Sequence, residues 1–311
     1  MMINKHLKLY ILLSVLGLFF VQCSIVNQFR YPSLKSIMDF TGLGDPRWSS
    51  DGTQIVFDGP GGELFIVNSD GTNRKSLKEQ TGFGYTPDWS PDSKRIVFAS
   101  RENRSMQIYT ITLNSGKIVQ LTHLSSASFP RWSPDGKKIA FCTKGSNKEE
   151  EGIYVMDEDG TNASQLTHYP IHDACAYDWS LDSTQLVFTA INDSLINDGQ
   201  NIQNSSSEPG FHMYVMNADG SDIRQLNNGM PGTYPTWSPD GKQILYNSFS
   251  ASMPLGFYIT ALDGSGGRKI FDSTSCDQLH WSSKTNHILY VCLTGLQTTQ
   301  LFTVDMKDVL K

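Results

Sequence analysis

The best candidates for metal ligands in this sequence are three histidines. His123 and His168 each follow a Leu-Thr pair, and His172 stands shortly after His168. Imidazole nitrogens are frequent ligands of transition metals, so these side chains could bind a metal ion if the fold brought them together. Leu-Thr-His also fits a plain repeat pattern, and no carboxylate stands at a spacing that would complete the set. We therefore predict no metal and no cofactor, and keep the three histidines as the alternative ligands.

Two acidic turns resemble calcium loops but lack their ligands. Asp157-x-Asp159-Gly160 and Asn217-x-Asp219-Gly220 miss the ligand ladder with its terminal glutamate. Their glycines are typical of tight hairpin turns, where a positive φ is needed. Hydrolase chemistry has no support either, because the chain contains no Gly-x-Ser-x-Gly elbow. We therefore predict no catalytic residues, and a protein that is not an enzyme.

The elements that must position these residues are repeats. Each of the six tryptophans is followed by serine, and their spacings are 41, 43, 47, 58 and 44 residues, mostly in the range of four-stranded propeller blades. Nine positions after each tryptophan stands an aromatic residue, and a second aromatic follows it. The tryptophans are Trp48, Trp89, Trp132, Trp179, Trp237 and Trp281; the aromatic pairs are Phe57 and Phe65, Phe98 and Tyr109, Phe141 and Tyr154, Phe188 and Tyr214, Tyr246 and Tyr258, and Tyr290 and Phe302.

Each copy predicts four short strands. In the third copy these are residues 129–133, 138–143, 152–157 and 164–167, separated by Pro-Asp-Gly and Asp-Gly turns and a longer connection. Both faces of such a sheet carry apolar side chains, so one copy cannot bury its aromatics alone. The pattern predicts an all-β fold, a six-bladed β-propeller of four-stranded antiparallel blades. The tryptophans are then core residues.

The two ends of the chain are predicted to share the last blade. Residues 300–305 form the last third strand, and too few residues follow for another turn and strand. Lys35-Ser-Ile37 resembles Lys75-Ser-Leu77, which is outer-strand material of the first copy. We therefore expect residues 33–38 to pair with residues 300–305, which removes an exposed strand edge.

The N-terminus has the features of a targeting segment. Basic residues precede an apolar run over residues 9–21, which is too short to span a bilayer as a helix. The run ends at Gln22-Cys23-Ser24, which resembles a bacterial lipoprotein signal whose cysteine carries the lipid; the alternative is an ordinary thiol. We expect a signal peptide of lipoprotein type over 1–23, a short linker over 24–32 and the propeller over 33–311. The protein would then be exported to the periplasm or cell envelope and tethered to a membrane through Cys23.

Strand order divides the loops between two faces. The long-loop face carries the connections from second to third strands and from outer strands to the next blade; the turn face carries the Pro-Asp-Gly and Asp-Gly turns. The long-loop face would bring Cys276 near Cys292 and Cys142 near Cys175, and an oxidising compartment permits disulfides at both pairs. It would also carry the insertion Ala190–Gly210, which is either a surface insertion or a binding loop.

The repeat units resemble a known family. Trp132-Ser-Pro-Asp-Gly136 and Trp237-Ser-Pro-Asp-Gly241, with Ile-Tyr-Val-Met-Asp at 153–157, look like the TolB-type propeller repeat, from residue 33 onward. The resemblance implies a six-bladed propeller like that of periplasmic TolB, which contacts other envelope proteins. The predicted propeller starts soon after Cys23, so we expect no counterpart of the α/β domain that precedes the TolB propeller. Similar repeats form the propeller of oligogalacturonate lyase, which uses histidines and a metal.

Charge and architecture together limit the functional classes. The net charge of −6 and the pI near 5.6 argue against a nucleic-acid partner. Our leading hypothesis is a non-catalytic, exported cell-envelope propeller that binds a protein or an envelope component through its long-loop face. The alternative is a carbohydrate-binding or carbohydrate-active propeller, similar to oligogalacturonate lyase, with a metal site.

Overall fold

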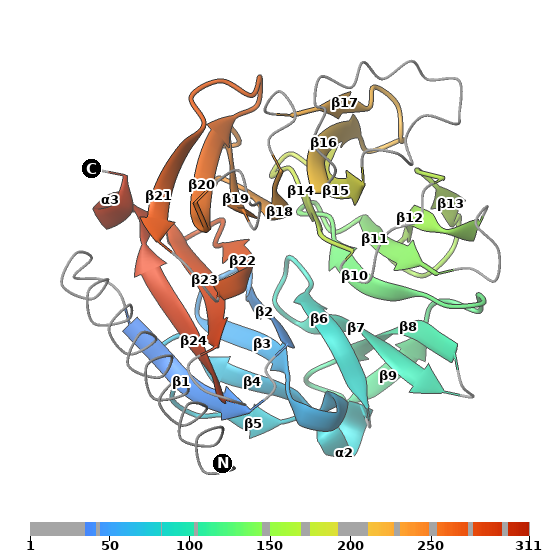
Figure 1. Ribbon diagram of the computed structural model, residues 1–311. Coiled ribbons are helices and arrows are strands. Elements are labelled where there is room, and N and C mark those ends of the chain that lie inside the picture. Colours follow the sequence, from blue (N-terminus) through green and yellow to red (C-terminus); the bar gives the residue numbers. More distant parts are fainter. Residues whose placement is uncertain are drawn as a thin grey trace, which may run out of the picture.

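The computed structural model describes residues 35–41, 44–81, 83–102, 105–144, 150–168, 175–191, 211–226, 231–248, 254–272, 276–293 and 298–310. Within these residues the chain forms six four-stranded antiparallel sheets arranged around a common axis (Figure 1). Each sheet is one blade, with its inner strand nearest the axis. The predicted all-β, six-bladed propeller is therefore confirmed.

The blades follow one another in chain order, and their strands are given from the inner strand outward. Blade 1 contains β2 (Gly44–Trp48), β3 (Gln54–Asp58), β4 (Leu64–Asn68) and β5 (Lys75–Ser76); blade 2 contains β6 (Gly84–Trp89), β7 (Arg95–Glu102), β8 (Ser105–Thr112) and β9 (Lys117–Gln120). Blade 3 contains β10 (Ser128–Trp132), β11 (Lys138–Thr143), β12 (Gly152–Asp157) and β13 (Ser164–Gln165); blade 4 contains β14 (Tyr177–Trp179), β15 (Gln185–Ile191), β16 (Phe211–Asn217) and β17 (Arg224–Gln225). Blade 5 contains β18 (Thr233–Trp237), β19 (Gln243–Ser248), β20 (Gly256–Ala261) and β21 (Arg268–Asp272); blade 6 contains β22 (Cys276–Trp281), β23 (His287–Leu293), β24 (Thr298–Asp305) and β1 (Lys35–Thr41). Three short helices, η1 (Pro60–Gly62), α2 (Lys78–Thr81) and α3 (Met306–Val309), complete the described elements.

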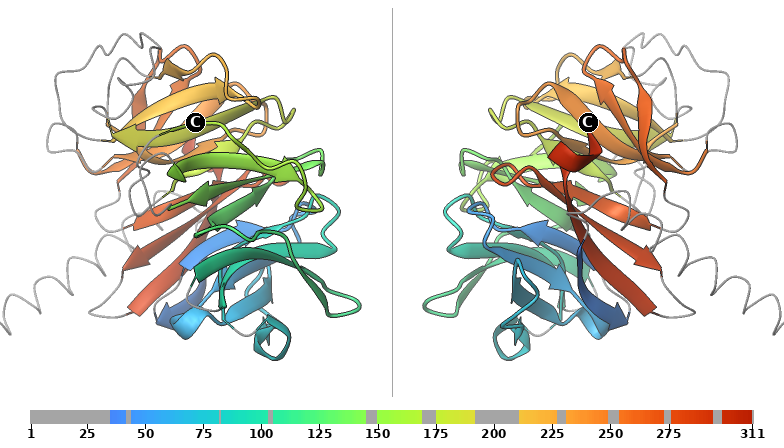
Figure 2. Two further views of the ribbon diagram at one scale, coloured as in Figure 1. Left: turned by 90° about the vertical axis from the view of Figure 1, so that its right-hand side faces the viewer. Right: turned by 90° about the vertical axis from the view of Figure 1, so that its left-hand side faces the viewer.

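The first and last strands of the chain share blade 6, as predicted. β1 pairs antiparallel with β24, from Lys35 opposite Thr303 to Thr41 opposite Thr298. The side views place β1 along β24 at the rim of the ring (Figure 2). The pairing extends beyond the expected residue 38. Because β1 covers the open edge of β24, the N-terminal strand closes the ring.

The two aromatic columns of the repeat face each other across the second and third strands. In each of the six blades the two aromatics are direct partners in the ladder, and their ring centroids lie 5.4 to 5.9 Å apart. Opposed aromatic pairs of this kind stabilise an antiparallel sheet. The repeat pattern in the sequence therefore corresponds to a cross-strand contact that recurs around the ring.

The core consists of separate clusters between neighbouring blades. One cluster joins Trp48 and Val67 of blade 1 to Leu289 and Leu301 of blade 6, and five further clusters fill the other interfaces. All six tryptophans are buried, at 3 to 6% exposure, which confirms their prediction as core residues. Since the apolar side chains pack between the blades, the space around the axis is left to polar residues. None of the described helices is long and apolar enough to cross a membrane.

Candidate functional site

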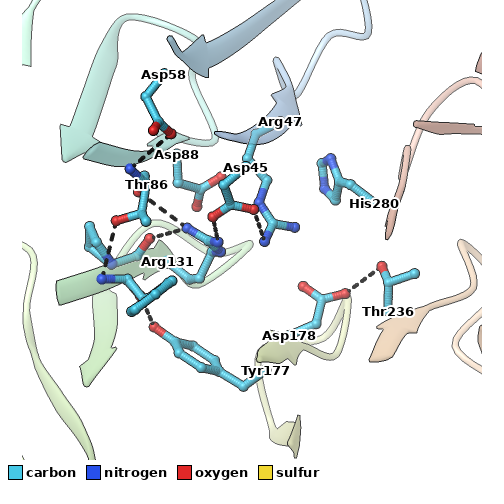
Figure 3. A network of polar contacts seen from close by, with 12 residues as sticks. Asp45, Arg47, Asp58, Thr86, Asp88, Arg131, Tyr177, Asp178, Thr236 and His280 are labelled. Carbon is cyan, nitrogen blue, oxygen red and sulfur yellow. Dashed lines mark hydrogen bonds and ion pairs between the residues drawn. The ribbon is translucent and has the colours of Figure 1, made fainter. Parts of the chain in front are cut away.

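A ring of polar side chains surrounds the propeller axis. Each comes from the residue that directly precedes a tryptophan on an inner strand. Side chains alternate along a strand, so the tryptophan packs between blades while its neighbour points to the axis. The ring consists, in blade order, of Arg47, Asp88, Arg131, Asp178, Thr236 and His280, and they converge in Figure 3. We call these six residues the axial ring.

The inner strands are bulged just before the axial ring. The ladder register shifts between Tyr85 and Asp88, and equivalent shifts occur in blades 1, 3, 5 and 6. Thr86 and Phe129 lie at the bulges with φ of 49° and 54°. Positive φ is unfavourable for such residues, so the backbone is strained here. A bulge re-aims side chains, and these bulges help direct the axial ring inward.

Four members of the axial ring accept a hydrogen bond from the next blade. In each case the donor is the backbone N–H of the following blade's tryptophan. Asp88 Oδ2 accepts from Trp132 at 2.8 Å, Asp178 Oδ2 from Trp237 at 2.9 Å, Thr236 Oγ1 from Trp281 at 3.3 Å, and His280 Nδ1 from Trp48 at 3.1 Å. These bonds join inner strands that share no ladder, and so help to close the ring around its axis.

The two arginines cannot follow this pattern, because a guanidinium has only donors. Both instead pair with Asp45, which stands three residues before Trp48. Arg47 Nη2 lies 3.1 Å from Asp45 Oδ1, and Arg131 Nη2 contacts the other carboxylate oxygen. The second pair spans from blade 1 to blade 3 (Figure 3). Burial by itself would raise the pKa of Asp45, but the charges of Arg131 and Arg47 outweigh it and lower that pKa.

The remaining ionisable groups near the axis are shifted toward their neutral forms. Burial raises the pKa of Asp58, at the long-loop end of β3, to about 7, and the charge of Asp45 adds to this effect. Burial likewise raises the pKa of Asp88 to about 6 and raises that of Asp178. Burial, with Arg47 and Arg131, lowers the pKa of His280 well below its usual value. His280 is therefore neutral, and its Nε2 carries the proton because Nδ1 accepts from Trp48.

A cavity of about 350 Å³ lies at the turn-face end of the axis. Its walls include all six tryptophans and every member of the axial ring except Thr236. Serine and proline residues of the Trp-Ser-Pro turns, together with Leu181, Ser283 and Lys284, form its mouth. Its volume is at the lower end of the range for small-molecule sites. We call it the axial cavity; it lies on the face where the sequence suggested only structural turns.

The histidines singled out in the sequence do not form a metal centre among the described residues. His123 and His168 are both exposed, and Gln120 Nε2 lies 3.2 Å from the His123 ring. No group of three histidine, cysteine or acidic side chains in the described ranges is arranged to hold a metal ion. His172 lies outside the described residues, as do Cys23 and residues 192–210 of the insertion.

The structure brings both predicted cysteine pairs together. Cys276 and Cys292 are direct partners in the ladder of blade 6, and their Cα atoms are 4.0 Å apart. Cys142 of blade 3 and Cys175 of blade 4 have Cα atoms 6.5 Å apart. In both pairs the sulfur atoms are in contact, so each pair is positioned to form a disulfide. Their oxidation in the protein remains a prediction.

Sequence reasoning missed the axial ring, although a signal existed. The position before each tryptophan is occupied by a charged, hydroxyl or imidazole side chain in every copy. Side chains alternate along a strand, so a polar residue directly before each core tryptophan should point away from the blade interface and toward the axis. The tryptophans repeat as one residue type, whereas the position before them repeats only in its polar character.

The described residues form a six-bladed β-propeller, and its repeats are similar to those of TolB propellers. Residues 61–194 match the family model described as the TolB beta propeller domain. A Tol-Pal system protein TolB of Francisella tularensis subsp. tularensis is 27% identical over an alignment of 235 residues, and the match covers 65% of this chain and 54% of that protein. The chain thus spans about half the length of the curated relatives it matches.

Solved structures show the same fold. TolB from Acinetobacter baumannii superimposes with a TM-score of 0.56 at 17% identity, over 85% of this chain and 64% of the other. An oligogalacturonate lyase in complex with manganese superimposes with a TM-score of 0.59 at 16% identity, over 86% and 79%. At these identities the likeness concerns architecture, because one propeller fold serves many functions.

Proposed function

We propose that this protein is a non-catalytic binding protein of the cell envelope. It is exported to the periplasm, tethered to a membrane through a lipid on Cys23, and binds a protein or another envelope component on its long-loop face. The observation that carries the proposal is the position of the exposed apolar side chains. The resemblance to a protein named for the Tol-Pal system supports an envelope setting.

Exposed apolar side chains gather on the long-loop face. The described residues contain eight large hydrophobic side chains that are exposed, and five of them lie at the long-loop ends of strands or in the long connections. These are Phe83, Leu124, Phe211, Leu255 and Leu293, of which Phe83 and Leu293 are 59% and 51% exposed. They belong to five different blade connections, so a partner that covers this face would bury several of them together. We call these five residues the apolar set.

The N-terminal strand enters the propeller at the opposite end. β24 runs from the long-loop face to the turn face, and Lys35 at the start of β1 lies opposite Thr303 near the turn-face end. A tether that precedes Lys35 therefore joins the molecule on the turn-face side. The long-loop face is then free of the attachment point and open to a partner.

The hydrogen bonds of the axial ring support a non-catalytic role. Asp88, Asp178, Thr236 and His280 each accept a hydrogen bond from a neighbouring blade. A general base needs an acceptor aimed at a substrate proton. Acceptors that already hold the ring together fit a structural task better than proton transfer.

Site-specific photo-crosslinking tests the proposed face. A photoreactive amino acid is placed in intact cells at Phe83 or Leu293, and in control variants at Leu181 of the turn face or Val119 of the outer strand β9, which are 47% and 39% exposed. We expect discrete adducts of one mass from the first two positions and none from the controls. Adducts from Leu181 alone, or from no position, would contradict the proposal.

The tether needs a separate test. Cys23→Ser should release the protein from the membrane fraction into the soluble envelope fraction, while the adduct at Phe83 still forms in reduced yield. An unchanged fractionation of the Cys23→Ser variant would refute the lipid tether and leave the long-loop face untouched.

A further inference from the structure

A second set of inter-blade hydrogen bonds lies at the long-loop end of the inner strands. Thr86 N–H donates to Asp58 Oδ1 at 3.2 Å, and Phe129 N–H donates to Thr86 Oγ1 at 3.2 Å. The hydroxyl of Tyr177 donates to the carbonyl oxygen of Phe129. These three bonds join blades 1, 2, 3 and 4 in sequence (Figure 3). We call Asp58, Thr86, Phe129 and Tyr177 the long-loop relay.

Two members of the long-loop relay have backbone conformations that need support. Thr86 and Phe129 lie at the bulges with positive φ, which is unfavourable for both residue types and persists only where the surroundings fix it. Each takes part in two bonds of the relay, once as a donor and once as an acceptor. Because Thr86 N–H has its acceptor in Asp58, the state of one carboxyl group affects the strained segment.

The carboxyl group of Asp58 changes its charge near neutral pH. Burial raises its pKa to about 7, the charge of Asp45 on β2 acts in the same direction, and Arg131 on β10 opposes them. From the other neighbouring strands, Leu64 of β4 lies opposite it in the ladder and Thr86 of β6 donates to it. The neutral group therefore suits this position, whereas the ionised group is better solvated in water. Asp58 is partly exposed, so an ionised side chain can turn outward and give up its bond to Thr86.

The long-loop relay supports the segment that carries the most exposed member of the apolar set. Phe83 is 59% exposed and stands three residues before Thr86. Ser100 Oγ donates to the carbonyl oxygen of Phe83, and the bond to Asp58 fixes Thr86 on the other side. Leu293 belongs to blade 6, whereas the relay spans blades 1 to 4. A change at Asp58 should therefore reach Phe83 and leave Leu293 in place.

We propose that the long-loop relay is a proton-operated latch on the partner surface. With Asp58 protonated, the relay is closed and holds Phe83 in place for a partner. When its proton has passed to water, the side chain turns outward, Thr86 is released and the surface around Phe83 loosens. A carboxyl group that ionises less readily in the closed state favours closure at low pH, so partner binding through Phe83 should weaken as the pH rises toward 8. This inference rests on the proposed function, although the latch itself belongs to the free protein.

Hydrogen exchange tests the latch in the purified full-length protein without a partner. Exchange of the Thr86 and Phe129 amides is followed by mass spectrometry at pH 6 and pH 8, after correction for the intrinsic pH dependence of the exchange rate. The carboxyl pKa of Asp58 is about 7 in the closed state and 3.8 when exposed, so the open fraction should rise about tenfold over this interval. The amides of β19 report global unfolding and should exchange more slowly at both pH values.

Two variants and a control assign the effect to the relay. Asp58→Asn keeps an acceptor for Thr86 N–H but cannot ionise, so the tenfold change should vanish. Thr86→Val removes the acceptor of Phe129 N–H; it should speed the exchange of that amide at both pH values, while Thr86 N–H or its replacement keeps the pH dependence. Asp182→Asn on the turn face is the matched control, because Asp182 also accepts a backbone N–H, and it should behave as the wild type.

Photo-crosslinking connects the latch to the partner surface. The adduct yield at Phe83, relative to that at Leu293, should fall between pH 6 and pH 8 in the wild type and stay constant in Asp58→Asn. Equal exchange rates in the relay and in β19, a pH effect that persists in Asp58→Asn, or a constant adduct ratio in the wild type would overturn the latch. The expected exchange without adducts at either position would support the latch and refute the partner surface, so the two failures are distinguishable.

Discussion

Asp178 is the member of the axial ring whose replacement tests the ring most sharply. Its Oδ1 atom accepts a hydrogen bond from the backbone N–H of Trp179 at 3.0 Å. Its Oδ2 atom accepts one from the backbone N–H of Trp237 at 2.9 Å and one from the hydroxyl of Thr236 at 2.8 Å. Asp178→Asn keeps the shape but has one acceptor oxygen in place of two. Its amide group must then face either the Trp179 or the Trp237 N–H, donor against donor.

The size of the effect follows from these contacts. The donor that loses its acceptor costs about 1–3 kcal/mol, and the bonds that remain are weaker because their acceptor is neutral. The substitution also removes the cost of burying a charge, which is real because burial raises the pKa of Asp178. We expect a net loss of about 2 kcal/mol in the free energy of unfolding. Thr236→Val should cost about 1–2 kcal/mol, because it loses the bond to Asp178 and the acceptor of Trp281 N–H.

A double-mutant cycle isolates the bond that the two residues share. Urea unfolding followed by tryptophan fluorescence should show the double variant to be more stable than the sum of the single effects by about 1 kcal/mol. Asp182→Asn is the matched control: it lies in the adjacent turn, and the three contacts of Asp182 all use Oδ1, which an asparagine retains. Its effect should stay below about 1 kcal/mol. Additive single effects, or an Asp178→Asn variant as stable as the control, would refute the role assigned to the ring.

Four further outcomes are expected. Trp132→Ala should destabilise the protein by about 3–5 kcal/mol, and an unchanged melting curve would contradict its place in the core. Deleting residues 31–40 removes most of β1 and should prevent folding to a stable monomer, as gel filtration and circular dichroism would reveal. Asp58 has a folded pKa of about 7, above its unfolded value of 3.8, so its contribution to stability is present at low pH and is lost as the pH rises through 7. From pH 8 to pH 6 this group should raise the free energy of unfolding by about 1 kcal/mol, and Asp58→Asn should remove that share and leave the smaller share of Asp88, whose pKa is about 6. Thiol titration of the folded, exported protein should find fewer free thiols than after reduction, and equal counts would exclude disulfides at Cys276–Cys292 and Cys142–Cys175.

The architecture could be predicted because its determinants are local and repeated. The tryptophans, the turns and the two aromatic columns recur in phase, so the pairing of residues such as Phe141 and Tyr154 follows from counting positions. The strand that closes the ring could also be predicted, because Lys35-Ser-Ile37 resembles the outer strand of blade 1 in sequence. In each case one residue type at one spacing carries one structural role.

The axial ring could not be found in that way, because one role is filled by several residue types. Aspartate, threonine and histidine share the ability to accept a hydrogen bond from the next blade, and nothing else in their chemistry is common. The bulges are equally hidden, since Phe129 has no sequence feature that favours a positive φ. Residue type alone is equally uninformative for the histidines, because His123 and His168 have the residue type of a metal ligand but lie exposed on separate blades.

The ring also explains how arginine can occupy blade 3. An arginine at position 131 cannot accept the N–H of Trp179, so that donor needs another acceptor. Asp178 supplies it: one carboxylate oxygen takes Trp179 of its own blade, and the other takes Trp237 of the next. Because Asp178 serves two blades, Arg131 is released to pair with Asp45 across the axis and to line the cavity. Asp178, which joins blade 4 to blade 5, thus also permits an arginine at position 131 of blade 3.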